Sequence, residues 1–284
     1  ARSATTLELR TAAVIPERLE GIGRAGLDLR WRDFSGQNLT GEVFFGADLR
    51  GADFSGATLE SADLRNAWLN GALLVGTIFK SANLAHADLG DAVILRSTFE
   101  FADLTGAVFE SAHVEDSNFT QATLDAVSFE GAMLASIDWS GFDLSGANLS
   151  KTDLTGAILA GTRLVGADLR GASLVGANLA GSDLTGSDLR EADLSSAVLV
   201  HAILVDAVVL GTSMVGALLD RADLRGMDLE SINLEGASMP RYMTAARSAT
   251  TLELRTAAVI PERLEGIGRA GLDLRWRDFS GQNL

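Results

Sequence analysis

A large apolar residue stands at every fifth position from Leu29 to Met239, without a break. These 43 positions hold 29 Leu, eight Phe, two Val, two Met, one Ile and one Trp. The residue two positions earlier is Ala, Ser or Thr in 34 of the 43 cases. Of the 23 glycines between residues 27 and 241, 22 fall two positions after a large residue, as in the unit Ala47-Asp48-Leu49-Arg50-Gly51.

A period of five fits neither an α-helix nor a straight strand. On a helix, five steps of about 100° rotate each large residue away from the last. On a strand, an odd spacing puts successive large residues on opposite faces. They share one core only if the chain turns about a quarter circle per unit, so that four units close a coil of about twenty residues and the coils stack. Glycine suits the corners, which require positive φ.

This pattern predicts an all-β solenoid of about eleven coils, with rungs about 4.8 Å apart. The units resemble those of the pentapeptide-repeat family over residues 27–241. The resemblance implies a right-handed quadrilateral β-helix, in which the large residue and the small residue before it point inward. Near the middle, Val127, Ile137 and Phe142 replace the small residue close to Trp139, which predicts a locally enlarged coil.

The sequence divides into three segments. Residues 1–26 lack the repeat and are expected to cap the first coil, with a short helix-compatible stretch from Pro16 to Glu20. Residues 27–241 form the solenoid, and residues 242–284 follow it. Residues 246–284 are identical to residues 1–39. Because natural duplications diverge, we interpret this copy as engineered or very recent, serving as a C-terminal cap, a permutation-like overlap or a head-to-tail joint between rods.

Composition narrows the classes of function. The chain carries 38 acidic and 23 basic residues, a formal net charge of −15, which argues against direct binding to nucleic acid. It has no cysteine, so disulfides and cysteine-ligated metals are excluded. Its apolar runs are too short for a membrane span, and its first residues do not resemble a signal peptide. The absent initiator Met suggests trimming, and a cytoplasmic location is expected.

Residues twenty positions apart should lie on the same side of the rod. Sorting the residue before each large residue in this way gives two acidic rows and one nearly uncharged side. The acidic rows are Asp48, Asp88, Asp168, Asp188 and Asp228 on one side, and Asp63, Asp103, Asp143, Asp183 and Asp223 on another. On the uncharged side, apolar residues gather toward the C-terminal end and around its corners. This candidate partner or self-association face comprises Ile158, Val198, Val200, Ile203, Val208 and Leu218.

No pattern in the sequence indicates catalysis, a cofactor or a metal. The three histidines, His86, His113 and His201, fall on different coils and sides. The stretch from Gly21 to Gly26 matches a dinucleotide-binding pattern by letters, but it follows no strand and opens no long helix. The aspartates recur as part of the repeat, so their number is no evidence for an acid–base pair. We therefore expect no enzyme activity.

Two hypotheses of function follow. The leading one is a non-catalytic rod that binds another protein or assembles with itself, possessing no cofactor and making no contact with nucleic acid or membrane. The alternative comes from the family resemblance, which implies an acidic rod that imitates DNA and binds DNA gyrase or topoisomerase IV, as fluoroquinolone-resistance members do. The acidic rows would then imitate phosphates.

Overall fold

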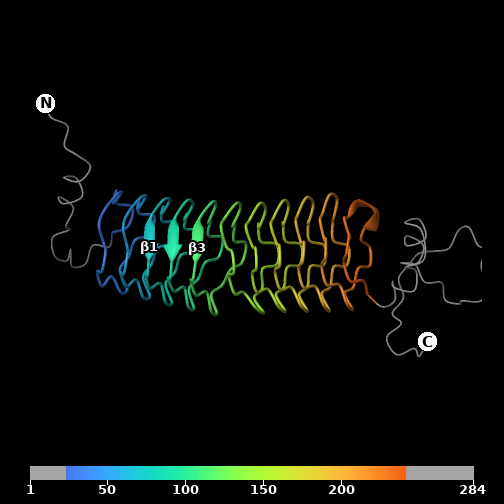
Figure 1. The fold of residues 1–284 in the computed structure, drawn as a ribbon. Helices are drawn as coiled ribbons and strands as arrows, with labels where there is room; N and C mark the ends of the chain where they lie inside the picture. Colours follow the sequence, from blue (N-terminus) through green and yellow to red (C-terminus); the bar gives the residue numbers. More distant parts are fainter. Residues whose placement is uncertain (1–23, 241–284) are drawn as a thin grey trace, which may run out of the picture.

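The computed structural model describes residues 24–240, which form a straight rod of stacked coils (Figure 1). Along the rod, residue n pairs with residue n+20 through parallel bridges, as Asp28 does with Asp48 and Asp168 with Asp188. A coil therefore contains twenty residues, and each unit of five makes one side of it. The predicted right-handed quadrilateral β-helix is confirmed.

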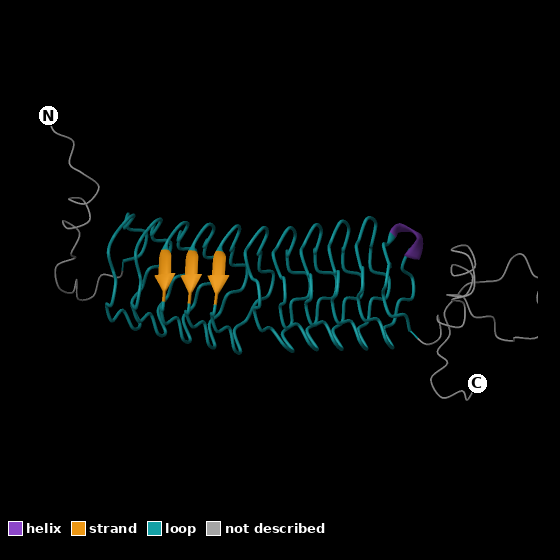
Figure 2. Ribbon diagram, viewed as in Figure 1, coloured by secondary structure: helices purple, strands orange, loops and turns teal. Residues whose placement is uncertain are grey.

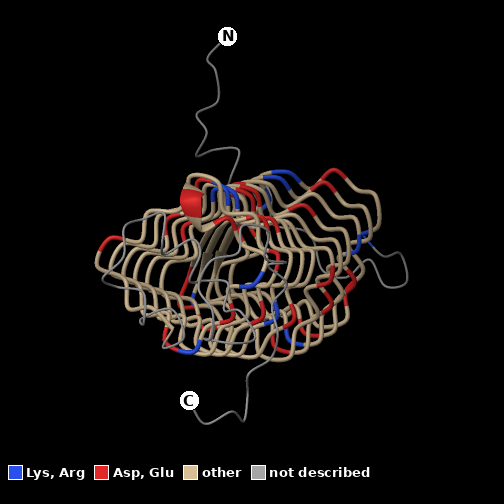
Figure 3. Ribbon diagram, turned by 90° about the vertical axis from the view of Figure 1, so that its right-hand side faces the viewer, with Lys and Arg blue, Asp and Glu red and all other residues tan. Residues whose placement is uncertain are grey.

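Four walls enclose the core, and each wall repeats every twentieth residue. We number them in chain order: wall 1 contains Leu29, wall 2 Phe34, wall 3 Leu39 and wall 4 Phe44. Wall 1 therefore lies opposite wall 3 and adjoins wall 4. Figure 3 looks along the rod and marks where acidic and basic residues occur along the walls.

Regular secondary structure is short because each wall is only a few residues wide. Wall 2 carries β1 (Leu73–Val75), β2 (Val93–Leu95) and β3 (His113–Glu115), which pair in parallel in that order (Figure 2). One turn of 3-10 helix, η1 (Leu229–Ser231), lies near the C-terminal end of the described residues. Elsewhere in residues 24–240 the coils pair mostly through single bridges.

The corners explain where glycine occurs. A typical corner is a four-residue turn: the Ala47 N–H donates to the Phe44 carbonyl at 2.9 Å, and Gly46 between them has φ +61°. Such a turn needs positive φ at its third residue, which glycine reaches without strain. In the described chain, 23 glycines and 19 other residues have positive φ, all at this corner position. The 19 other residues carry the strain that glycine avoids.

The core is one continuous column. Every large residue of the period from Leu29 to Leu224 is buried. Phenylalanines on one wall stack directly, since the rings of Phe79 and Phe99 lie 4.8 Å apart, as do those of Phe99 and Phe119. That spacing equals the expected distance between rungs of about 4.8 Å. The coils are therefore superposed without offset.

The four buried threonine hydroxyls in the small inward position are satisfied by the preceding coil. Thr77 donates to the carbonyl of Phe54 at 2.9 Å, and Thr162 donates to that of Trp139 at 2.7 Å. Thr152 and Thr212 make the same contact with the carbonyl 23 residues earlier. This contact lets Thr replace Ala inside the rod without leaving a polar atom unpaired.

Arg24 closes the N-terminal end of the column. It occupies the inward position of its unit, and its guanidinium lies 5.4 Å from the ring centre of Phe34 and 5.1 Å from that of Phe44. The Arg24 N–H also donates to the carbonyl of Val43, so coil pairing begins before the expected boundary at residue 27. Residues 1–23 and 241–284, which include most of the expected cap and the duplicated segment, lie outside the described residues.

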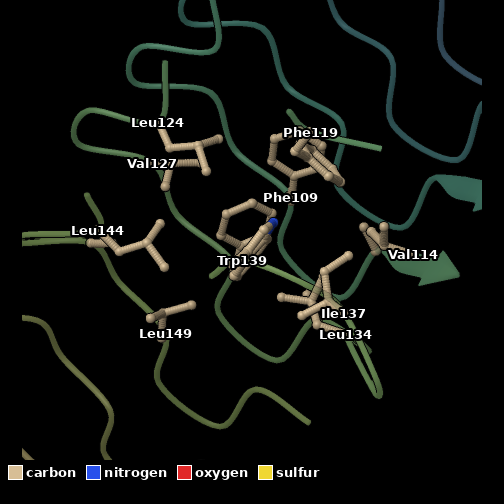
Figure 4. Packing of buried hydrophobic residues seen from close by; sticks show 14 of the residues in the cluster. Phe109, Val114, Phe119, Leu124, Val127, Leu134, Ile137, Trp139, Leu144 and Leu149 are labelled. Atoms are coloured by element: carbon tan, nitrogen blue, oxygen red, sulfur yellow. The ribbon is translucent and has the colours of Figure 1, made fainter. Parts of the chain in front are cut away.

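The stacking is interrupted near the middle of the rod. Between residues 114–127 and residues 134–147, walls 3 and 4 lack the bridges that join most neighbouring coils. We call this interruption the seam. Figure 4 shows its interior, where Trp139 lies beside Phe119 and Ile137. The seam coincides with the coil expected to be enlarged, because Ile137, Trp139 and Phe142 together exceed the usual pattern of one large and one small inward residue per wall.

Candidate binding surfaces

The aspartate or asparagine before each large residue has a structural role. Its side chain accepts a hydrogen bond from the backbone N–H two residues later, as Asp53 does from Ser55 at 2.9 Å and Asp103 from Thr105 at 3.0 Å. This contact fixes the backbone leading into the corner and satisfies a backbone donor. The acidic rows are thus in part a consequence of the fold.

The two acidic rows lie on adjacent walls. The Asp48 row is on wall 1 and the Asp63 row is on wall 4. Only Asp168 and Asp188 in these rows are directly bridged neighbours. On wall 4, the bridges join Asp63 to Asn83 and Asp143 to Arg163, so a carboxylate occurs only on every second coil.

Six of the ten aspartates in the rows form salt bridges with arginine. In five of the six salt bridges, the arginine lies two residues after the aspartate. The residues directly before and directly after an inward residue both point outward on the same wall, so their side chains can meet. The N···O distances range from 2.5 to 3.3 Å. The pairs are Asp48–Arg50, Asp63–Arg65, Asp168–Arg170, Asp188–Arg190, Asp223–Arg225 and, between coils, Asp143–Arg163. Sorting only the residue before each large residue missed these pairs. The triplet Asp-Leu-Arg in the sequence indicates them, because it places an arginine two residues after an aspartate.

These pairs change the electrostatics of the rows. DNA carries one negative charge per about 1.7 Å of its axis. On wall 4, carboxylates two coils apart are separated by about 9.6 Å, and three of the five are paired with arginine. The rows therefore present alternating charge rather than a continuous negative line.

Hydrogen bonds from arginine lower the pKa of several aspartates. The hydrogen bond from Arg30 lowers the pKa of Asp28 to about 2, and the corresponding bonds from Arg50 and Arg170 lower the pKa of Asp48 and Asp168. A carboxyl group whose pKa is lower in the folded state stabilises the fold above its unfolded pKa. That contribution is lost as pH falls from about 4 toward the folded pKa.

We expect replacement of Arg30 by glutamine to raise the pKa of Asp28 from about 2 toward its ordinary value, because the glutamine lacks the charged donor. The side-chain carboxyl resonance of Asp28, followed by NMR from pH 6 to pH 1.5, measures this directly. Replacement of Arg163, which lies far from Asp28 on wall 4, is the control and should leave the Asp28 titration unchanged. A parent Asp28 that titrates at its ordinary pKa would contradict the pairing.

The six residues of the candidate apolar face do not form one surface. Ile158, Val198 and Leu218 lie on wall 3, where Asn178 separates the first from the second, and Val200 follows at the next corner. Ile203 lies on wall 4, and Val208 lies on wall 1, opposite wall 3. Ile158 and Leu218 expose 40% and 43% of their surface. The usable apolar surface on wall 3 is therefore the short stretch of Val198, Val200 and Leu218.

The described residues offer no evident chemistry. Residues 24–240 contain no group of three or more histidine and carboxylate side chains placed to hold a metal ion. In the same range, no helix has the length and apolar character needed to cross a bilayer. His113 lies 3.5 Å from Glu115, beside a cavity of about 520 Å³ that opens at the seam between walls 2 and 3.

The twenty-residue coil, the glycine corners and the solid apolar column define a rod-like quadrilateral β-helix. A family model described as pentapeptide repeats matches residues 28–66, 59–94, 102–138, 140–171 and 172–209, with eight copies. The chain therefore belongs to the pentapeptide-repeat family.

Solved structures of the same family are similar to this chain. HetL, a protein involved in regulating heterocyst differentiation in the cyanobacterium Nostoc, is 32% identical, covering 77% of this chain and 92% of its own, with a TM-score of 0.42. A thylakoid-lumen protein of Arabidopsis thaliana is 28% identical, covering 43% and 90%, with a TM-score of 0.31. QnrB1, a plasmid-mediated fluoroquinolone resistance protein, is 18% identical, covering 79% and 91%, with a TM-score of 0.22. A comparison with curated protein sequences finds no match.

Proposed function

We propose that this protein is a non-catalytic rod that binds another protein, or a second copy of itself, through its outer walls. The observation that supports this proposal is the fixed position of its outward polar side chains. Asp138 accepts hydrogen bonds from both the N–H and the hydroxyl of Ser140, and Asp193 accepts the same pair from Ser195. Side chains that are already ordered lose little entropy on binding, so a rigid wall is a favourable recognition surface.

Self-association would use the apolar stretch of wall 3. We expect the double replacement Val198→Lys and Leu218→Lys to convert a dimer into a monomer, because lysines of the two copies would be brought together and desolvated. Sedimentation velocity between about 5 and 100 µM covers the affinities of weak dimers. The matched control is Ser173→Lys with Ser213→Lys, in the same outward position on wall 2. A parent protein that is monomeric throughout would exclude this face and leave a different protein as the partner.

The second candidate function is imitation of DNA, with gyrase or topoisomerase IV as the partner. The observation in its favour is the acidity of residues 40–245, which contain 28 acidic and 11 basic residues. The arginine pairs on walls 1 and 4 weigh against it, since they neutralise most of the aspartates that would replace phosphates. A gyrase supercoiling assay separates the two functions: we expect no inhibition by an excess of the protein, and inhibition would favour the DNA mimic.

A further inference from the structure

The seam leaves two β edges without partners. On the regular coil pair before it, Phe99 donates to the carbonyl of Asn118 at 2.7 Å and Phe101 to that of Thr120 at 3.1 Å. At the seam, within the described residues, seven such bonds to the facing coil are missing: five N–H groups on the earlier coil and two on the later coil. They belong to Asp116, Phe119, Gln121, Leu124 and Ala126, and to Asp138 and Asp143. Unpaired edges of this kind readily accept another strand.

Solvent reaches positions at the seam that are covered elsewhere. Ser117, Ala122 and Phe142 occupy the small inward position but are only half-buried, whereas most residues in that position are fully buried. The cavity of about 520 Å³ lies at the start of the seam, where Asp116 and Asp138 line it together with apolar residues such as Val114 and Ile137. The start of the seam is therefore open to solvent beside apolar side chains, and we call this opening the slot.

One buried polar group in the core at the seam is also unpaired. The side chain of Trp139 is fully buried, and its indole Nε1 makes no hydrogen bond. Its ring meets that of Phe119 on the preceding coil edge-on, at 5.9 Å across the seam. A buried donor without an acceptor costs about 1–3 kcal/mol.

The slot is acidic. Residues 114–147 contain six acidic residues and neither Lys nor Arg. Glu130 pairs with Lys151 and Asp143 with Arg163, both from the following coil. Asp116, Asp125 and Asp138 have no ion pair among the described residues. Asp116 and Asp138 both line the cavity.

We propose that the seam binds an extended, basic segment of a partner polypeptide, which adds a strand between the two open edges. Its backbone pairs with the free groups of Phe119, Gln121 and Asp138, alternate apolar side chains enter the slot, and the basic side chains between them reach Asp116 and Asp138. This proposal locates the binding site of the rod and so rests on the proposed function.

The test uses the full chain and an eight-residue fluorescein-labelled peptide of alternating lysine and valine. We expect saturable binding by fluorescence anisotropy, about tenfold weaker or worse with Asp116→Lys and Asp138→Lys together. The matched control is Asp91→Lys with Asp193→Lys. Asp91, like Asp116, is a corner residue of positive φ, and Asp193 accepts the same two serine bonds as Asp138. The control should bind as the parent does, and a glutamate–valine peptide should not bind.

Hydrogen exchange distinguishes strand pairing at the seam from a general electrostatic attraction of the basic peptide to the acidic rod. Such attraction would not slow the exchange of particular amides. With the lysine–valine peptide bound, the amides of Phe119, Gln121 and Asp138 should exchange at least about tenfold more slowly, while those of Phe99 and Phe101 should not change. Equal weakening in both double variants, or protection spread over the whole rod, would overturn the proposal. The wall 3 experiment does not involve the seam, so a failure here leaves the proposed function standing.

Discussion

Replacement of Phe99 by alanine is expected to lower the free energy of unfolding by about 3–5 kcal/mol. The ring of Phe99 is fully buried, stacks on Phe79 and Phe119 at 4.8 Å each, and meets Phe109 edge-on at 6.3 Å. Its removal leaves a cavity that superposed coils cannot close, because the backbone ladder fixes their spacing. Urea unfolding monitored by circular dichroism measures the loss.

Phe101 is the matched control, since it lies two residues further along the same coil. It is a corner residue with φ +59°, it is 48% exposed, and its ring lies 5.8 Å from the Lys80 ammonium. Phe101→Ala should therefore cost less than about 1 kcal/mol. Similar losses for the two variants would contradict the assignment of inward and outward positions.

The second large effect is expected at a glycine corner. Gly226→Ala should cost about 1–3 kcal/mol more than Gly176→Ala. Both glycines have positive φ, so both alanines incur the left-handed penalty of about 1–2 kcal/mol. A methyl group at Gly226 would also lie 3.1 Å from the backbone nitrogen of Asp206 and closer still to its carboxylate, whereas nothing lies within 4 Å at Gly176.

Thermal unfolding of both glycine variants gives the comparison, and a third variant identifies the cause. Adding Asp206→Gly to Gly226→Ala removes the carboxylate that the methyl group meets, so it should restore part of the difference. Equal stability of Gly226→Ala and Gly176→Ala would contradict this explanation. It would mean that the side chain of Asp206 does not limit which residue fits at the corner of the next coil.

The coil and its corners could be predicted because one period fixes both. Five residues per wall leave a single closed arrangement for the large side chains, and the glycine position follows from the turn. The requirement for positive φ at the corner is strong, because corners without glycine, such as Ala126 and Phe101, adopt positive φ despite their Cβ atoms. The register imposed by the neighbouring coils outweighs the local preference of the residue.

The surface was predicted less completely, because it depends on pairs of positions. The acidic rows lie on walls 1 and 4, but an arginine two residues after an aspartate neutralises it, as in Asp188 with Arg190. Apolar residues that are near one another in the sequence can also lie far apart on the rod. Val198 and Val208 are ten residues apart, which is half a coil, so they lie on opposite walls.

The seam could be predicted only in part. The bulky residues Val127, Ile137 and Phe142 marked an unusual coil, but the large-residue period continues through it without change. Which hydrogen bonds break depends on how Trp139 packs against Phe119 at 5.9 Å and Phe129 at 5.0 Å, and this is a property of three coils together.

Disulfide trapping tests the twenty-residue coil most directly, because the chain has no cysteine of its own. Cysteines at Ser173 and Asp193, which are bridged neighbours on wall 2, would have Cα atoms about 4.8 Å apart, within the range of a disulfide. We expect this pair to oxidise fully in the monomer. The pairs 173 with 188 and 173 with 198 lie on different walls and should remain reduced. Oxidation at a separation of 15 or 25 residues, with none at 20, would contradict the coil and the wall assignments derived from it.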